Sequence, residues 1–347
     1  MKREKRIVRL LPVSAVAVLA AAFFSFSIIA DSESNNKDSE KKNDFIKWVE
    51  FQVSSEMLGK AYELDRDSYG TETHIDWVEL LACTAARFGG EFSKEQKVLR
   101  YMDETAKGLL EGTSMEEYTQ GLEYYDYFQE AYSAVLGGMV GEFEAETGEG
   151  IWEKVYGLKA FSPIAKGFSY SDYDDFGVSR SYGYQRNHLG HDLMGQIGTP
   201  IICVESGYVE ALGWNQYGGW RIGIRSFDGK RYYYYAHLRQ NYPYAEGLAE
   251  GSVVLAGDVL GYMGHTGYSA KENVNNIDTT HLHFGIQLIF DESQKEGTNE
   301  IWIDCYQIVK VLSRHRSEAV KVGDTREWVR RYGIKDPEAE AYQRKMK

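Results

Sequence analysis

The sequence is poor in cysteine and has no surplus of basic residues, and each shortage excludes a class of protein. Its only cysteines are Cys83, Cys203 and Cys305, which are far apart and show no CxxC spacing. An odd and small number of distant cysteines argues against a disulfide framework, so we expect buried free thiols. The net charge of −13 supplies no basic footprint for phosphates, which argues against DNA or RNA as a partner.

A long uncharged segment lies near the N-terminus. Residues 10–30 contain no charged side chain and are rich in Val, Ala, Leu, Phe and Ile, which is the length and polarity of a membrane-spanning helix. Basic residues precede this segment and none follows it directly, so the remainder of the chain is predicted to lie outside the membrane. The alternative is a cleaved signal peptide and a secreted protein, but residues 27–30 form a poor cleavage site.

Changes in composition and hydrophobic pattern along the chain predict an α+β, multidomain protein. Residues 1–30 are the anchor or signal segment, and residues 31–43, which have no apolar side chain, are predicted to be a polar stalk. Residues 44–150 are predicted to be a helical module, residues 162–316 a mostly antiparallel β domain, and residues 317–347 a charged tail that is frayed from Lys335 onward. Three capping boxes support the helices: Thr73 with Asp76, Ser93 with Gln96, and Ser114 with Glu117.

Histidines and one aspartate recur in the β region at informative spacings. In the strand predicted from Thr280 to Leu288, His281 and His283 are two apart, so both should emerge from one face of a sheet. The same alternation, applied to the preceding YYYYAHL segment, places His237 on the face of Tyr233 and Tyr235. Several imidazoles on polar strand faces are costly to arrange unless a ligand satisfies them.

The types of these residues suit a catalytic zinc site. Such a site has three protein ligands from His, Asp or Glu and keeps one position open. His188, Asp192 and His283 would supply two imidazoles and one carboxylate. His237 and His281 would then remain to move protons and to stabilise a developing oxyanion.

The sequence around these residues resembles the M23 metallopeptidases, the lysostaphin-like endopeptidases. The resemblance covers roughly residues 180–290 and is carried by H-x-x-x-D at His188 and Asp192, by H-x-H at His281 and His283, and by His237 between them. It implies a mostly antiparallel β fold with the site in a groove between strands. It also implies one Zn²⁺ per chain on His188, Asp192 and His283, catalysis by His237 and His281, and no other cofactor.

The predicted function is therefore a membrane-anchored zinc metalloendopeptidase that cuts peptide bonds in peptidoglycan. A biotinyl- or lipoyl-carrier domain is the weaker rival, because no lysine lies between Gly247 and Gly264 to carry the group. The stronger rival is an extracytoplasmic, non-catalytic scaffold or regulator of other wall hydrolases, although such proteins typically lose a zinc ligand. In either case the helical module is a candidate surface for a protein partner. His191 and His265 are expected to be structural.

Overall fold

The computed structural model describes residues 45–181, 185–295, 297 and 299–346. The described residues from Phe45 onward form one compact unit. The predicted anchor and stalk, residues 1–30 and 31–43, lie outside the described residues. Within the described part of the chain, no helix is both long enough and apolar enough to cross a membrane.

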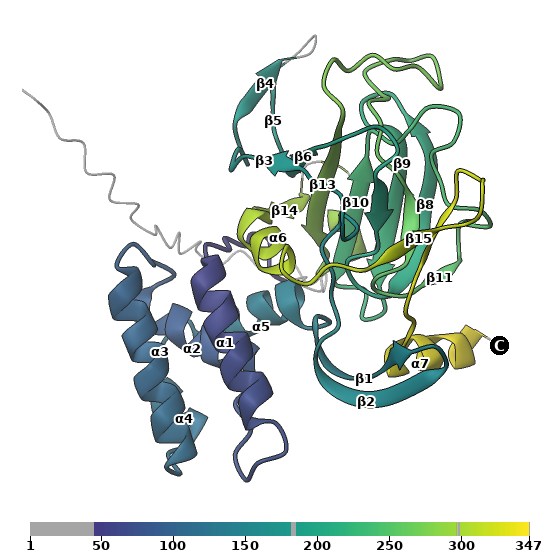
Figure 1. Ribbon diagram of the computed structural model, residues 1–347. Helices are drawn as coiled ribbons and strands as arrows, with labels where there is room; N and C mark the ends of the chain where they lie inside the picture. The colour runs from purple at the N-terminus through teal and green to yellow at the C-terminus, as the bar shows by residue number, and fades with distance from the viewer. Residues whose placement is uncertain (1–44, 182–184, 296, 298, 347) are drawn as a thin grey trace, which may run out of the picture. The chain divides into compact units, whose positions relative to one another are not determined.

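The N-terminal part of the unit is helical, as predicted (Figure 1). Its helices are α1 (Ser55–Ser68), α2 (Trp77–Phe88), α3 (Glu95–Leu110), α4 (Met115–Thr119) and α5 (Tyr125–Leu136). The side chain of Ser114 accepts a hydrogen bond from the Glu117 amide, as its capping box predicts. The capping of α2 was predicted one turn too early, because Asp76 and not Thr73 is the N-cap. Helix α3 begins after Lys94 without a side-chain cap.

The helices end earlier than the predicted boundary at residue 150. Strands β1 (Val140–Gly148) and β2 (Ile151–Leu158) follow α5 and pair as an antiparallel hairpin. Its tight turn needs a residue with positive φ, and Gly150 provides it with φ 74°. The prediction of a helical module is therefore wrong for residues 140–148. They form a strand because their pairing partner, β2, lies beyond residue 150.

The following region is a mostly antiparallel sheet, as predicted. Its eight strands are ordered β11-β8-β9-β10-β13-β6-β3, and β14 pairs with the far end of β13. The strands of this sheet are β3 (Ser171–Asp172), β6 (His191–Met194), β8 (Gly207–Asn215), β9 (Gly219–Ser226), β10 (Arg231–Ala236), β11 (Val253–Val254), β13 (His281–Leu288) and β14 (Ile301–Ile303). Smaller two-stranded sheets are formed by β4 (Ser179–Ser181) with β5 (Gln185–Asn187) and by β7 (Pro200–Ile202) with β12 (Val259–Tyr262).

The large sheet has one apolar face and one polar face. On β13, Leu282, Phe284 and Ile286 are completely buried in the core. Tyr233 and Tyr235 of β10 lie on the same side, since their rings contact Phe284. The intervening residues of β13 therefore face the opposite side, where His281 and His283 lie.

A buried ion pair joins the helices to the sheet. Arg231, at the start of β10, donates to both carboxylate oxygens of Glu205, from Nε at 2.7 Å and from Nη2 at 3.0 Å. Its Nη1 donates to the carbonyl oxygen of Ala134 in the last turn of α5, at 2.7 Å. Helix α6 (Tyr306–Leu312) adds a second link, because the Gln307 side chain accepts from the backbone amide of Ser55 at 2.9 Å.

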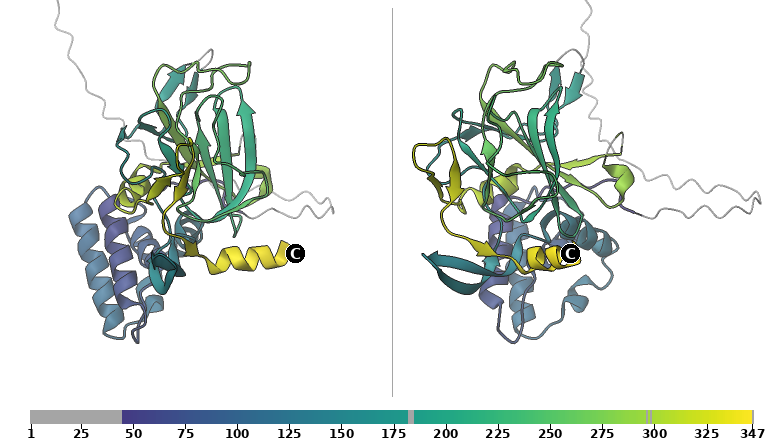
Figure 2. Two further views of the ribbon diagram at one scale, coloured as in Figure 1. Left: turned by 45° about the vertical axis from the view of Figure 1, so that its right-hand side comes forward. Right: turned by 90° about the vertical axis from the view of Figure 1, so that its right-hand side faces the viewer.

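Residues 317–346 form regular elements, and the frayed end predicted from Lys335 onward is wrong for residues 335–346. They contain β15 (Ala319–Lys321), β16 (Trp328–Arg330), β17 (Ile334–Lys335) and α7 (Pro337–Met346), and α7 lies beside the β1–β2 hairpin in Figures 1 and 2. Strand β17 pairs with β1. The charges are neutralised by specific partners: the buried Lys159 ammonium lies 3.1 Å from a carboxylate oxygen of Asp336, which fixes the start of α7.

Candidate metal centre and catalytic groove

Two neighbouring strands and the loop before one of them bring the predicted metal ligands together. Strand β6 pairs with β13 so that Asp192 lies opposite His283, and His188 precedes β6 by a short loop. His188 Nε2 lies 3.0 Å from His283 Nδ1 and 3.1 Å from Asp192 Oδ1. The third side of this triangle, from His283 Nδ1 to Asp192 Oδ1, measures 2.9 Å.

The geometry and the chemistry of these donors fit a zinc ion. Two imidazole nitrogens and one carboxylate oxygen are the typical donors of an open tetrahedral zinc site. With metal–ligand bonds of about 2.0–2.1 Å, the donors of such a site stand roughly 3.3 Å apart. His188, Asp192 and His283 are the group of residues in the described chain that could hold a metal ion. Gly190 permits the approach, since a Cβ there would lie 2.7 Å from His283 Nε2.

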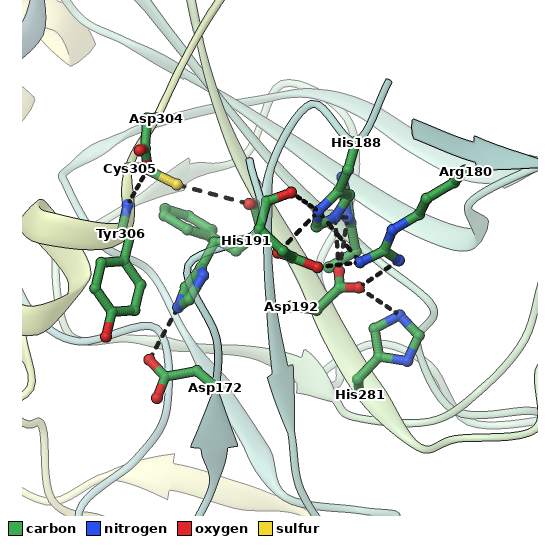
Figure 3. Close-up of polar contacts among 12 residues, drawn as sticks. Asp172, Arg180, His188, His191, Asp192, His281, Asp304, Cys305 and Tyr306 are labelled. Atoms are coloured by element: carbon green, nitrogen blue, oxygen red, sulfur yellow. Dashed lines mark hydrogen bonds and ion pairs between the residues drawn. The ribbon is translucent and has the colours of Figure 1, made fainter. Parts of the chain in front are cut away.

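Two residues that the sequence analysis missed support these donors. Asp175 accepts from His188 Nδ1 at 3.0 Å, and a carboxylate in this place orients a ligating imidazole. Arg180, at the centre of β4, donates from Nη1 to Asp192 Oδ2 at 2.8 Å and also contacts Asp175 (Figure 3). Both residues precede the H-x-x-x-D motif, and only the folding of the β4–β5 hairpin over the site brings them to it.

Electrostatics favour the ionised form of Asp192. Burial alone would raise the pKa of this carboxyl group, but the polar contacts with His188 and His283 outweigh burial and hold the pKa well below its usual range. Burial also lowers the pKa of His283, which favours the neutral imidazole. A carboxylate and neutral imidazoles are the protonation states that a metal requires.

His237 and His281 lie next to each other beside this triangle, with ring centroids 4.7 Å apart. The Nδ1 atom of His237 lies 2.9 Å from the carbonyl oxygen of Thr266, and that of His281 lies 2.8 Å from the carbonyl oxygen of Thr279. A carbonyl can only accept, so each Nδ1 carries a proton, and in the neutral imidazole this leaves Nε2 as the acceptor. Burial, followed by the nearby His281 and His283, holds the pKa of His237 well below its ordinary value.

The backbone at His237 corrects the strand argument made from the sequence. Simple alternation placed His237 on the face of Tyr233 and Tyr235, which is the buried core face. His237 has a φ of 64°, a left-handed conformation that is rare for residues other than glycine, and its side chain lines the groove instead. Its partnership with His281 therefore depends on a break in alternation just after β10 ends at Ala236.

The other histidines have structural partners, as expected. His191 lies on the opposite face of β6 from Asp192, and its Nε2 is 3.0 Å from a carboxylate oxygen of Asp172; Figure 3 shows this pair apart from the His188–Asp192 group. His265 Nδ1 lies 2.6 Å from the carbonyl oxygen of Ile277. The three cysteines are buried and free, which agrees with the prediction.

A groove of about 630 Å³ runs over the polar face of the sheet past His188, His237 and His283. Its walls include several tyrosines, among them Tyr234, whose ring contacts that of His283. The charged side chains that line it are Arg180, Arg186, Arg221, Lys295 and Glu300. The groove is thus rich in cations although the chain carries a net charge of −13.

Comparison with known proteins identifies this part of the chain. Residues 186–299 match the model of Peptidase family M23. The L-Ala–D-Glu endopeptidase of Bacillus subtilis is 33% identical over 159 residues, which are 46% of this chain and 45% of that protein. Lysostaphin of Staphylococcus simulans is 33% identical over 120 residues, 34% of this chain and 20% of that protein. The chain therefore spans less than half of the length of these relatives.

A solved structure extends the likeness beyond the peptidase domain. The crystal structure of a candidate glycyl-glycine endopeptidase lytM from Ruminococcus gnavus aligns with a TM-score of 0.51 and 26% sequence identity. The alignment covers 78% of this chain and 91% of the other. Because the family match covers only residues 186–299, the shared architecture must also include elements outside it.

Proposed function

We propose that the chain is a zinc metalloendopeptidase that hydrolyses peptide bonds in peptidoglycan. The observation that carries the proposal is the convergence of donor atoms from His188, Asp192 and His283 beside two imidazoles, His237 and His281. The relatives named for L-Ala–D-Glu and for glycyl-glycine endopeptidase activity support the substrate class. The complete set of residues favours an enzyme over a non-catalytic scaffold.

His188, Asp192 and His283 would hold the zinc ion. When bound, zinc would act as a Lewis acid toward the scissile carbonyl and would make water a stronger nucleophile at neutral pH. Asp175 and Arg180 would keep the ligands in place, since each contacts a ligand from the outer side. The substrate would lie along the groove over His283.

His237 and His281 would carry the proton transfers. In the neutral imidazole the proton sits on Nδ1, which each backbone carbonyl holds, so the Nε2 atom can accept the proton of the attacking water. The resulting imidazolium can donate a hydrogen bond to the oxyanion of the tetrahedral intermediate and then protonate the leaving amine. Together these groups supply acid, base and oxyanion stabilisation within one pocket.

We also propose that the enzyme acts outside the cell membrane, attached by residues 10–30. The uncharged length of this segment and the basic residues before it support this location. In sequence, helices α1–α5 lie between the anchor and the groove residues, and they could contact a protein partner. Membrane fractionation of cells that produce the full chain, with alkaline extraction, would release the protein if the anchor were absent or cleaved.

The proposed function is tested by zinc content and by the release of new amino termini from purified peptidoglycan. We expect about one zinc per chain in the wild type, loss of zinc in His283→Ala, and retained zinc with a loss of most activity in His281→Ala. His74→Ala, in the helical part, is the matched control and should keep both properties. Zinc without hydrolysis by the wild type would favour the scaffold, and wild-type hydrolysis by both site variants would refute the mechanism.

A further inference from the structure

Arg221 is a cation whose side chain lines the groove. Its Nη1 atom is buried and has no hydrogen-bond partner among the described residues, although its side chain lines the groove. Arg225, on the same strand and face as Arg221, is paired with Glu292 at 2.6 Å, although its Nη1 atom also has no hydrogen-bond partner among the described residues. Arg221 therefore differs from Arg225 in having no carboxylate partner among the described residues.

A buried charged donor without a partner is unfavourable for the folded protein. Such a group loses its hydration and gains no hydrogen bond in return, so native proteins rarely keep one without a functional reason. In a groove the missing partner can be supplied by a ligand. A guanidinium recognises a carboxylate best, because two parallel N–H groups match its two oxygens.

The register of the sheet places Arg221 at a useful distance from the candidate metal ligands. His283 lies opposite Ala236, and Tyr235 lies opposite Ile222, so Ala236 and Arg221 occupy adjacent places on the polar face. One strand separates His283 from Arg221, which corresponds to about 10 Å across the sheet. The small Ala236 between them, and Gly213 opposite Arg221 on β8, keep the floor of the groove low.

A second guanidinium strengthens the positive character of the groove. Arg186 of β5 stands 5.5 Å from the ring centroid of Tyr217 and 5.1 Å from that of Tyr268, and it donates to the Tyr268 hydroxyl. These neighbours are neutral. In contrast, Lys295 is paired with Glu210, and Glu300 is hydrogen-bonded to the Trp302 indole.

We propose that Arg221 binds a carboxylate of the substrate and so determines specificity. The preferred substrate is a peptide with a free carboxylate within two or three residues of the scissile bond, and not an uncharged glycine bridge. An extended peptide advances at most about 3.3–3.6 Å per residue, which matches the distance from His283 to Arg221. This inference rests on the proposed function and names the substrate class of the same site.

The test uses the zinc-loaded full chain in detergent and three synthetic peptides. The first contains an L-Ala–D-Glu bond with a free glutamyl carboxylate, the second has a carboxamide in its place, and the third is pentaglycine. We expect the wild type to cleave the first peptide with the highest kcat/KM. Arg221→Gln should lower kcat/KM for the first peptide by about 10- to 100-fold, mainly through KM, and leave that for the second unchanged.

Three controls separate specificity from structure. Arg100→Gln removes an exposed cation on α3 and should change neither peptide. Arg221→Lys keeps the charge but not the paired N–H groups, so it should restore part of the preference. The Tm of Arg221→Gln should equal or exceed that of the wild type, because the substitution removes an unsatisfied buried group, whereas a structural arginine would lower the Tm when replaced.

The outcomes distinguish this inference from the proposed function. Equal cleavage of the first and second peptides by the wild type would overturn the inference, and so would an equal loss of kcat/KM for both peptides in Arg221→Gln. Neither result would contradict the proposed endopeptidase activity. Failure to cleave any peptide or peptidoglycan would overturn the proposed function. In that case calorimetry of peptide binding tests the inference. The wild type must bind the first peptide at least 10-fold more tightly than the second, and Arg221→Gln must not.

Discussion

The ion pair between Arg231 and Glu205 should control the stability of the whole described unit. We consider Arg231→Met, which keeps most of the side-chain volume but removes the charge. The substitution leaves the Glu205 carboxylate, which is only 3% exposed, without its cation, and it leaves the Ala134 carbonyl of α5 without its donor. Asp228 also loses a partner at 2.9 Å, but it is more exposed and contributes less.

The size of the effect follows from the burial of both partners. Removal of one member of a buried ion pair costs about 3–5 kcal/mol, because the remaining charge stays desolvated. An unsatisfied buried carbonyl adds roughly 1–3 kcal/mol when no water can replace its donor. We therefore expect the free energy of unfolding to fall by about 4 kcal/mol or more, which is a large share of the roughly 5–15 kcal/mol of a typical protein.

Urea denaturation of residues 45–347 measures this loss, with the m-value compared between variants. Arg100→Met, on the exposed side of α3, is the control and should change stability by no more than about 0.5 kcal/mol. The double variant Arg231→Met with Glu205→Gln no longer carries an unpaired Glu205 carboxylate. Its loss of unfolding free energy should therefore be smaller than the sum of the two single losses by at least about 1 kcal/mol. A loss below about 1 kcal/mol for Arg231→Met, or strictly additive losses, would refute the reasoning.

Two further predictions concern the site. Gly190→Ala would bring a Cβ to 2.6 Å from His283 Cε1 and 2.8 Å from the Phe284 carbonyl oxygen, so zinc content should fall markedly; Gly59→Ala, with nothing within 4 Å, is its control. Because burial holds the pKa of His237 below its ordinary 6.5, this base stays neutral as pH falls past 6.5, and the acid limb of the kcat–pH profile should lie below that pH. An acid limb at or above pH 6.5, or wild-type zinc in Gly190→Ala, would contradict these arguments.

The part of the site that could be predicted depends on local periodicity. His281 and His283 were assigned to one polar strand face, and the structure agrees, because a paired central strand keeps strict alternation. The same argument was wrong for His237, because a residue with left-handed φ breaks the alternation of side chains between the two faces of the sheet. No glycine or turn motif at His237 indicates this break in alternation from the sequence.

The parts that could not be predicted depend on contacts between distant segments. Asp175 and Arg180 reach the metal ligands only because β4 and β5 fold over them, and neither residue belongs to a recognisable motif. Residues 140–148 form a strand because they pair with β17, near the C-terminal end of the chain. Residues 334–335 form that strand, and α7 follows it. Charge and composition alone suggested a helix in one place and a frayed end in the other.

The pairing of β1 with β17 also affects the order in which the protein can be assembled. Lys335 contacts Glu144 across a sequence separation of 191 residues, so the small sheet β17-β1-β2 cannot be completed until the peptidase domain has been synthesised. At about 5–20 residues per second, this interval lasts on the order of 10 s or more. During that time one edge of β1 has no strand beside it and can pair with another chain. We therefore expect synthesis at high protein concentration to favour association through β1 before β17 is made.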